Sequence, residues 1–420
     1  MVDVLKICKE AKSASANLAL ADTATKDKAL TLLVQWLREN IKEILTENDK
    51  DVEQAKKKGL SEALIDRLRL MPERINAIAV DLENVVNLPD PIGEIFENKV
   101  LPNGLKVCKV RIPLGVIAVI YESRPNVTID VASLALKSGN AVILRGGSET
   151  INSNRILVKG IRNALTNAGI DPAAVQFIDD SSHEPISQLL KMHQYVDLLI
   201  PRGGAALHTF CRENSTIPVI TGGIGICHLF VDASANLEKS IEVIRNAKVQ
   251  RPSVCNALDT VLVHRDVAME LVPRLLESLQ QDGVSFRVEE ELLRSLNIQP
   301  NSAVQIASSQ DFDTEWLSLV LGIKAVSNLE EAIQHIADHS THHSDGILTE
   351  DRANAARFTR EVDSAAVYVN ASTRFTDGSQ LGLGAEVAVS TQRLHARGPM
   401  ALRELTTYKW VVEGDYQTRK

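Results

Sequence analysis

The stretch Val116-Ile117-Ala118-Val119-Ile120 decides the fold class, together with the two segments that follow it. A helical pattern covers residues 129–137, and a second apolar run, Ala141-Val142-Ile143-Leu144, comes next. Short runs that are apolar at every position are typical of strands buried on both faces, which belong to parallel sheets. The order strand, helix, strand therefore predicts a doubly wound α/β domain.

The same alternation continues along the chain and predicts a second α/β domain. A helix is expected over residues 152–168, and the first sheet is expected to gain strands over 175–178, 196–200 and 218–220. After the run at 227–231, a second set of strands is expected over 260–263, 323–326 and 365–369, with a helix over 328–338. The first hundred residues show helical spacing of apolar residues and are expected to form a layer of helices.

Composition and charge exclude several classes of function. The chain has 420 residues, 44% of them hydrophobic, and a formal net charge of −8. It has no basic surplus, so nucleic acid is not an expected partner. The five cysteines are scattered without a C-x-x-C pair, which argues against a disulfide framework and a zinc site. The N-terminus has no apolar stretch typical of a signal peptide or membrane span, so we expect a cytoplasmic protein with no membrane partner.

Cys255 is a candidate nucleophile because of its place in the pattern. It lies between a helical segment that ends at Lys248 and the strand expected over 260–263. A cysteine attacks as the thiolate, and helix ends, nearby cations and backbone N–H groups favour that form. The alternative is a buried cysteine that acts as a small apolar residue.

Two glycine-rich segments are candidates for a cofactor loop, although no intact G-x-G-x-x-G opens a helix. Pro201-Arg202-Gly203-Gly204 leaves an expected strand and enters a helix whose free N–H groups could face a pyrophosphate. A turn that needs glycine only for its geometry is the alternative. Gly222-Gly223-Ile224-Gly225 leads into a strand, which makes it the weaker candidate. The histidines at 335, 339, 342 and 343 lack an H-E-x-x-H pattern, and we expect no metal site.

Six long motifs follow one another along nearly the whole chain. They are Tyr121-Glu122-Ser123-Arg124-Pro125-Asn126-Val127, Gly139-Asn140-Ala141-Val142-Ile143-Leu144-Arg145-Gly146-Gly147, Ile200-Pro201-Arg202-Gly203-Gly204, Pro218-Val219-Ile220-Thr221-Gly222-Gly223, Gln250-Arg251-Pro252-Ser253-Val254-Cys255, and Tyr368-Val369-Asn370-Ala371-Ser372-Thr373-Arg374-Phe375-Thr376-Asp377-Gly378. With these motifs the chain resembles the aldehyde dehydrogenase superfamily and, within it, the family of γ-glutamyl phosphate reductases.

The resemblance implies a role for individual residues. Cys255 would be the catalytic nucleophile, and Asn126 would form an oxyanion hole with the backbone N–H of Cys255. Arg124 and Arg374 are candidates for binding the substrate phosphate and carboxylate, since guanidinium groups match both anions; ion pairing within the protein is the alternative. The expected cofactor-binding residues are Arg145, Gly146, Gly147, Ser148, Arg202, Gly203, Gly204, Gly222, Gly223 and Glu315.

The implied activity is reduction of L-glutamate 5-phosphate to L-glutamate 5-semialdehyde and phosphate through a cysteine thioester, a step of proline biosynthesis. Oxidising aldehyde dehydrogenases place a glutamate, the base for hydrolysis, before the paired glycines, where this chain has Ile220 or Thr221. NADPH is the expected cofactor, because Ser148 stands where NAD-using members commonly have glutamate. An oxidising or coenzyme-A-acylating aldehyde dehydrogenase and a non-catalytic member of the fold are the alternatives.

The resemblance also implies a domain plan and an assembly. We expect a cofactor-binding domain (residues 1–104 and 122–230), a catalytic domain (231–365) and a return segment (366–389). Residues 105–121 and 390–420 are expected to form a small β arm for oligomerisation. The fold class is therefore α/β, aldehyde dehydrogenase-like, with two doubly wound domains. A homodimer or dimer of dimers is expected, and glutamate 5-kinase is a candidate partner.

Overall fold

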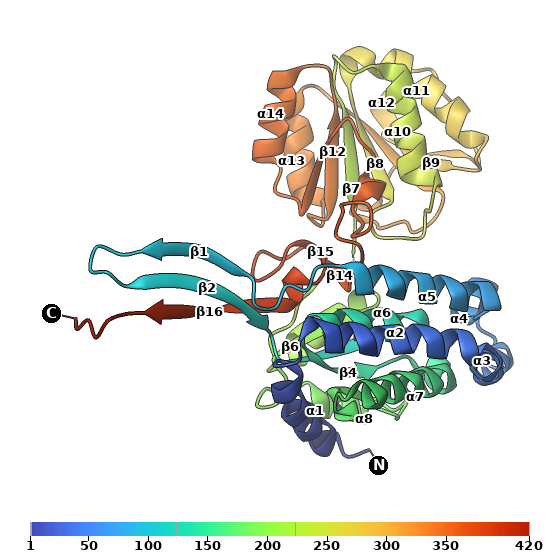
Figure 1. The fold of residues 1–420 in the computed structure, drawn as a ribbon. Coiled ribbons are helices and arrows are strands. Elements are labelled where there is room, and N and C mark those ends of the chain that lie inside the picture. The colour runs from blue at the N-terminus through green and yellow to red at the C-terminus, as the bar shows by residue number, and fades with distance from the viewer. Residues whose placement is uncertain (1, 123, 223, 420) are drawn as a thin grey trace. The chain divides into compact units, whose positions relative to one another are not determined.

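The computed structural model describes residues 2–122, 124–222 and 224–419, and the chain divides into two compact units (Figure 1). Unit 1 comprises Met1–Thr221, Gly382–Ala388 and Met400–Lys420. Unit 2 comprises Gly222–Leu381 and Val389–Pro399. Within the described residues, no helix combines the length and the apolar character needed to cross a membrane.

Unit 1 is built on a parallel sheet in the order β5-β4-β3-β6. The strands are β3 (Val116–Tyr121), β4 (Ala141–Arg145), β5 (Val175–Phe177) and β6 (Leu198–Arg202). All residues of β3 and β4 are buried, which confirms the predicted burial on both faces. The chain runs from β3 outward to β5 and then returns to β6, so the strand order reverses between β3 and β6. The strand predicted over 218–220 is reduced to a bridge between Val219 and Leu199.

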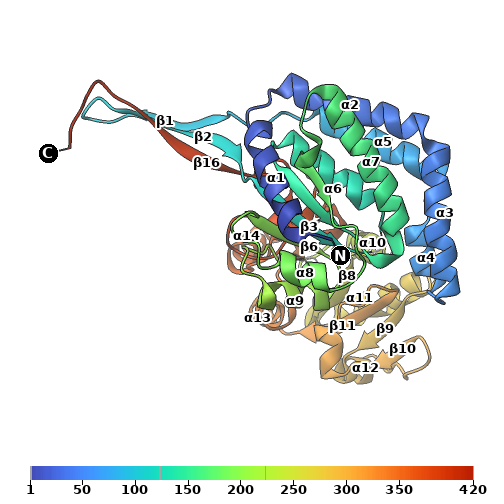
Figure 2. The ribbon, with the colours of Figure 1, turned by 90° about the horizontal axis from the view of Figure 1, so that it is seen from below.

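The helices of unit 1 cover this sheet, as the N-terminal pattern predicts. Helices α6 and α7 pack against the strands, α2, α3 and α5 pack on α6 or α7, and α1 packs against β4 and β5 (Figure 2). Their bounds are α1 (Val4–Leu18), α2 (Thr23–Glu39), α3 (Ile41–Lys57), α4 (Glu62–Leu68), α5 (Pro72–Asn87), α6 (Asn126–Lys137), α7 (Ile151–Ala168), α8 (Glu184–Leu189) and α9 (Ala205–Asn214).

A separate antiparallel sheet extends from unit 1 (Figures 1 and 2). It consists of β1 (Ile95–Val100), β2 (Lys106–Pro113) and β16 (Thr406–Glu413), with β2 in the middle. We call this sheet the arm. Lys109 on β2 lies over the rings of Tyr408 and Trp410 on β16, 4.4 and 4.9 Å from their centroids. Cation–π contacts of this kind stabilise one face of the arm.

Unit 2 is built on a second parallel sheet, in the order β10-β9-β11-β8-β7-β12-β13. Helices α10, α11 and α12 supply one hydrophobic cluster, and α13 and α14 supply another around Phe230, Leu262 and Ile347. The bounds are β7 (Cys227–Val231), α10 (Leu237–Val249), β8 (Leu258–His264), α11 (Arg265–Gln280), β9 (Ser285–Val288), α12 (Glu290–Ser295), β10 (Val304–Ile306), β11 (Val320–Val326), α13 (Leu329–His339), β12 (Ser344–Leu348), α14 (Arg352–Glu361) and β13 (Ala366–Val369), followed by the paired strands β14 (Ala388–Ser390) and β15 (Gly398–Met400).

The observed boundaries differ from the predicted domain plan. Strand β3 lies inside the sheet of unit 1 rather than in the arm, and β1 joins the arm. Strand β7 belongs to the sheet of unit 2 rather than to the cofactor-binding domain, and β13 is an edge strand of unit 2 rather than part of a return segment. Val389–Pro399 belongs to unit 2 rather than to the arm. A strand that is apolar at every position fits either sheet, so its sequence does not indicate which sheet it joins.

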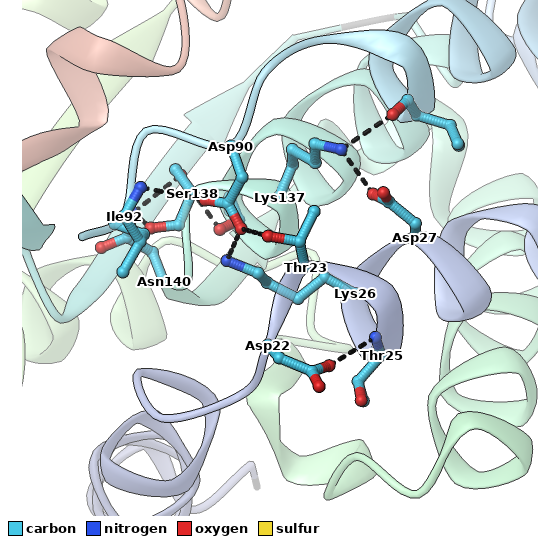
Figure 3. Close-up of polar contacts among 12 residues, drawn as sticks. Asp22, Thr23, Thr25, Lys26, Asp27, Asp90, Ile92, Lys137, Ser138 and Asn140 are labelled. Atoms are coloured by element: carbon cyan, nitrogen blue, oxygen red, sulfur yellow. Dashed lines mark hydrogen bonds and ion pairs between the residues drawn. The ribbon is translucent and has the colours of Figure 1, made fainter. Parts of the chain in front are cut away.

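A buried ion pair ties α2 to the segment between α5 and β1 (Figure 3). Lys26 Nζ lies 2.5 Å from Asp90 Oδ2, and the two side chains are only 1% and 7% exposed. Asp90 also accepts hydrogen bonds from the Thr23 hydroxyl at 2.9 Å and from the Ile92 N–H at 3.0 Å. The carboxylate is therefore bound to three donors, which is what a buried charge requires.

Two further polar residues of the same region hold distant segments together (Figure 3). Lys137, at the end of α6, is buried and donates to Asp27 on α2. Asn140 accepts from the Gly115 N–H at 2.8 Å and donates to the Leu405 carbonyl, also at 2.8 Å. Asn140 thus connects the start of β3 and β4 to the chain that enters β16, which gives this part of the Gly139-Asn140 motif a structural role.

We expect Asp90→Ala to destabilise unit 1 by about 3 to 5 kcal/mol, because it leaves the Lys26 ammonium buried without its carboxylate. Urea-induced unfolding at pH 7 measures the loss. The matched control is Asp22→Ala, which removes an exposed cap of the same helix and should cost much less. The double variant Lys26→Met with Asp90→Leu should recover most of the stability. An Asp90→Ala variant no less stable than Asp22→Ala would contradict the role given to the pair.

Candidate active site

In unit 1 the loops that follow β3 and β6 meet at the carboxyl edge of the sheet. The Glu122 N–H donates to the Arg202 carbonyl at 3.1 Å, and the Gly204 N–H donates to the Glu122 carboxylate at 3.3 Å. The strand order reverses between these two strands, and in open α/β sheets the crevice at such a point is the usual ligand site. The structure therefore places Arg202, Gly203 and Gly204 where a cofactor loop is expected.

Asn126 is the first residue of α6 and follows the same loop. Its Nδ2 donates to Asp130 Oδ2, one turn along the helix, at 2.8 Å. Burial raises the pKa of Asp130 to about 6, although the hydrogen bond from Asn126 acts in the opposite direction. Arg124 is half-buried just ahead of the helix. Asn126 and Arg124 thus lie close together in the chain, at the edge that carries Arg202.

Arg145 ends β4 and is the central residue of the third loop at this edge. It is only 7% exposed and donates to the carbonyls of Gly146, Ser181 and Ser182 at 2.9, 3.0 and 3.2 Å. Its Nε is buried without a hydrogen-bond partner, and burial lowers the pKa of the guanidinium. Arg145 therefore holds together the loop that follows β4 and the loop that contains Ser181 and Ser182. This structural role is additional to any contact that Arg145 makes with a ligand.

The glycines of these loops fall into two groups. A Cβ on Gly146 would overlap Asn154, and one on Gly203 would overlap the Glu122 carboxylate, so internal packing explains both. At Gly204 a Cβ would meet nothing within 4 Å, and the backbone φ of −72° is open to any residue. Packing does not explain Gly204, which begins α9. The Gly204 N–H at this helix N-terminus donates to the Glu122 carboxylate at 3.3 Å, so a dinucleotide phosphate bound there would replace that carboxylate as the acceptor.

In unit 2 Cys255, Glu315 and Thr341 precede their strands and therefore lie at the amino edge of the parallel sheet, whereas Arg374 follows β13. Cys255 is half-buried in the loop between α10 and β8. Glu315 precedes β11, and Thr341 precedes β12. In unit 1, by contrast, the candidate residues follow their strands and lie at the carboxyl edge of the sheet.

Three hydrogen bonds hold residues 225–227, at the start of β7, and one of them goes to the Cys255 loop. The Gly225 N–H donates to Glu315 Oε1 at 2.8 Å, and the Ile226 N–H donates to the Thr341 hydroxyl at 3.0 Å. The Cys227 thiol donates to the Cys255 carbonyl at 3.3 Å. A Cβ on Gly225 would overlap that same carbonyl, so only glycine permits this approach. Burial raises the pKa of Glu315 to about 7.

Arg374 is held by residues on both sides of the nucleophile. Its Nε donates to Gln250 Oε1 at 2.8 Å, and its Nη1 donates to Asn256 Oδ1. Burial and the neighbouring charge of Arg251 lower the pKa of Arg374. The predicted substrate residue therefore lies beside the Cys255 loop, and its ion-binding group is oriented by two amide side chains.

The other buried cysteines are held as thiols. Burial raises the pKa of Cys8 to about 12 and that of Cys211 to about 11, and it raises the pKa of Cys227 well above its usual value. No disulfide joins the five cysteines, all of which lie in the described part of the chain. Since the thiolate is the reactive form, Cys8, Cys211 and Cys227 are poor nucleophiles at neutral pH.

The remaining predicted residues are placed as follows. Gly147 and Ser148 follow Gly146, and the Ser148 hydroxyl donates to Glu149 Oε1 at 2.8 Å. Gly222 belongs to unit 2, where it forms a bridge with Ser390, and Gly223 lies outside the described residues. The described residues contain no group of three or more potential metal ligands.

Sequence reasoning missed three residues that hold the predicted ones. Asp130 could have been found from its i, i+4 spacing to Asn126 on an expected helix. Asn256 follows Cys255 directly, and Gln250 begins the same motif, but neither shows by its type that it binds Arg374 from a distant part of the chain.

Comparison with known proteins places the chain in a family. The aldehyde dehydrogenase family model matches residues 1–295. The γ-glutamyl phosphate reductase of Vibrio vulnificus is 54% identical over 418 residues, which is 100% of both chains. The enzyme of the same name from Serratia marcescens is 54% identical over 407 residues, covering 97% of each chain.

A solved structure agrees with these sequences. The crystal structure of γ-glutamyl phosphate reductase from Thermotoga maritima has 46% sequence identity to the chain and a TM-score of 0.97, with 100% of both chains covered. The fold, the motifs and the full-length similarity lead to one assignment. The chain belongs to the aldehyde dehydrogenase family and, within it, to the γ-glutamyl phosphate reductases.

Proposed function

We propose that this enzyme reduces L-glutamate 5-phosphate to L-glutamate 5-semialdehyde and releases phosphate, a step of proline biosynthesis. The observation that carries the proposal is the half-buried Cys255 loop in a chain 54% identical, over its full length, to γ-glutamyl phosphate reductase of Vibrio vulnificus. The orientation of Arg374 by Gln250 and Asn256 supports it further, because a fixed guanidinium beside the nucleophile suits an anionic substrate.

The chain's own residues account for the covalent steps. The Cys255 thiolate attacks the γ-carbonyl carbon, and the oxyanion that forms is bound by Asn126 Nδ2 and the Cys255 backbone N–H. The bond to phosphate then breaks, which leaves a thioester on Cys255. After reduction, collapse of the thiohemiacetal releases the semialdehyde and restores the thiolate. Arg124 and Arg374 bind the phosphate and the substrate carboxylate.

The cofactor site and the missing base fit a reductase. Arg202, Gly203 and Gly204 at the reversal of strand order, with Arg145, Gly146, Gly147 and Ser148, would hold a nicotinamide dinucleotide, which supplies the hydride. Gly222, Gly223 and Glu315 complete the proposed cofactor-binding set. Where hydrolytic relatives need a glutamate, Ile220 is buried and Thr221 has no basic group. The thioester is thereby protected from activated water.

The reverse reaction tests this proposal. With glutamate 5-semialdehyde as the substrate, we expect repeated turnover, seen as sustained reduction of NADP⁺, only when inorganic phosphate is present, because phosphate must accept the acyl group from Cys255 before the next cycle. Absorbance of the reduced cofactor measures the rate against phosphate concentration. Oxidation at full rate without phosphate, or a requirement for coenzyme A, would point to another aldehyde dehydrogenase activity.

The nucleophile is tested by paired cysteine variants in the same assay. Cys255→Ala should abolish turnover while leaving the unfolding profile unchanged. Cys211→Ala is the control, because Cys211 is a buried thiol of unit 1 and should tolerate the change with a modest loss of activity. Substantial turnover by Cys255→Ala would rule out the covalent mechanism.

We also propose that NADP(H) is the preferred cofactor. NAD-selective sites place a carboxylate against the ribose 2′-hydroxyl, where it would repel a 2′-phosphate. Ser148 provides a hydroxyl instead, and the positive charge of Arg145 lies beneath the same loop. Glu149 opposes this preference, since its carboxylate accepts from Ser148 at 2.8 Å.

Two charge variants test the cofactor loop. The native enzyme should favour NADPH over NADH by at least about tenfold in kcat/KM, which corresponds to about 1.4 kcal/mol. Ser148→Glu should move the preference towards NADH, and Glu149→Gln should move it further towards NADPH. A native preference for NADH, or no change of preference in Ser148→Glu, would refute the proposal.

We propose that the arm joins this chain to a second copy of itself. Both edge strands, β1 and β16, have an unpaired side within the described chain, and an unpaired edge can extend a partner's sheet. The arm also exposes large apolar side chains: Ile95, Val100, Trp410 and Val412 are 62%, 69%, 52% and 55% exposed. Their burial between copies would stabilise a homodimer or a dimer of dimers.

Light scattering at micromolar concentration tests the assembly. The native protein should have a mass of at least twice the 46.0 kDa monomer. Replacing Trp410 and Val412 by Glu should shift the mass towards the monomer. Leu20→Glu is the control, because Leu20 is equally apolar and 85% exposed but lies outside the arm. A monomeric native protein would overturn the proposal.

We place the reaction in the cytoplasm. Five cysteines without a disulfide are typical of a reducing compartment, which would also protect a thiolate nucleophile from oxidation. Glutamate 5-kinase, which would make the labile acyl phosphate, is a candidate partner, and mixing the two proteins in the light-scattering experiment would detect a complex.

A further inference from the structure

The carboxylate of Asp130 fixes which way the Asn126 amide faces. The two residues are one turn apart on α6, and Asn126 Nδ2 lies 2.8 Å from Asp130 Oδ2. A carboxylate only accepts hydrogen bonds, so it can bind the NH₂ group of the amide and not its oxygen. Asn126 then donates one Nδ2 hydrogen to Asp130. Because the amide group is planar, the direction of the second Nδ2 hydrogen is fixed as well.

We propose that Asp130 is the positioning residue of the oxyanion donor Asn126: its carboxylate holds the amide in one orientation and leaves the second Nδ2 hydrogen available to the developing oxyanion. This inference rests on the proposed role of Asn126 in the reaction. A donor that is already oriented needs no reorganisation when the charge develops, which is why fixed donors accelerate reactions. A hydrogen bond to an ionised acceptor is also stronger than a neutral one, so it holds the amide more firmly.

The surroundings of Asp130 make a purely structural role a poor explanation. Burial raises the pKa of Asp130 to about 6; Asp81 on α5 raises it further, and Arg202 at the end of β6 lowers it. The folded-state pKa is therefore above the usual value of 3.8, so the ionised form is the less favourable one in the folded protein. Stability is consequently lost as the pH rises from about 4 through 6. At neutral pH the protein retains a carboxylate that weakens its fold.

Asp130 is proposed to orient Asn126, and its charge is unfavourable in the folded protein. Removing its carboxylate should therefore affect the stability of the protein and the rate of the reaction in opposite directions. Asp130→Ala should leave the melting temperature at pH 8 equal to or slightly above that of the parent, since it removes an unfavourable charge that is only half-buried. The same change should lower kcat by about 10- to 100-fold, with a much smaller change in KM, because an oriented donor acts mainly in the transition state. Asp130→Asn should recover part of kcat, since its amide oxygen can still accept from Asn126.

The pH profile of kcat provides a readout that a structural role would not change. The parent should lose activity as the pH falls through about 6, because protonation weakens the acceptor for Asn126. Asp130→Asn should lack this decline. The matched control is Asp81→Asn, which removes a neighbouring negative charge; it should keep kcat at pH 8 and move the decline to lower pH.

Asn126→Ala, measured in parallel, separates this inference from the proposed function. It should lower kcat by about two to three orders of magnitude, and adding Asp130→Ala to it should cause little further loss. If Asn126→Ala keeps the parent kcat, the oxyanion role itself is wrong. If Asn126→Ala loses kcat and Asp130→Ala does not, or if Asp130→Ala lowers only the melting temperature, the positioning role of Asp130 is overturned.

Discussion

Strands that are buried on both faces leave a protein only the ends of its sheets for chemistry. All of β3 and β4 is buried and apolar except Arg145 at the very end of β4, so polar groups of unit 1 collect where the strands stop. In unit 1 this happens at the carboxyl edge, where the strand order reverses. In unit 2 Cys255 and Glu315 lie at the amino edge. The same constraint thus places the proposed cofactor-binding residues of unit 1 at one kind of edge and the proposed nucleophile of unit 2 at the other.

At the nucleophile edge, positions are set by backbone contacts more than by side-chain packing. Gly225 lies directly against the Cys255 carbonyl, and Glu315 and Thr341 bind the N–H groups on either side of that contact. The backbone N–H of Cys255, the second proposed oxyanion donor, belongs to the loop whose carbonyl makes this contact. The first proposed donor, Asn126, is held by the Asp130 carboxylate at 2.8 Å without any substrate bound.

The positions of strands and helices were predicted well from the sequence. The domain to which each strand belongs was predicted less well. The apolar runs at 116–120 and 141–144 and the helix at 152–168 agree with β3, β4 and α7 to within a residue or two. The assignment of β7 and β13 to a domain was wrong, because an apolar strand carries no mark of the sheet that it joins. At the site, residue types and motif order indicated Cys255, Asn126 and Arg374. The residues that hold them act through contacts such as Gln250 to Arg374, 124 positions apart, which no local pattern reveals.

In the proposed mechanism the acyl group passes through a thioester on Cys255, and this intermediate can be trapped. Native enzyme is mixed with NADP⁺ and glutamate 5-semialdehyde without phosphate, quenched in acid, digested and examined by mass spectrometry. We expect one glutamyl group on the peptide that contains Cys255, and we expect it to disappear when phosphate is added before the quench. A glutamyl group on another cysteine, or reduced cofactor formed with Cys255 unmodified, would contradict the proposed mechanism.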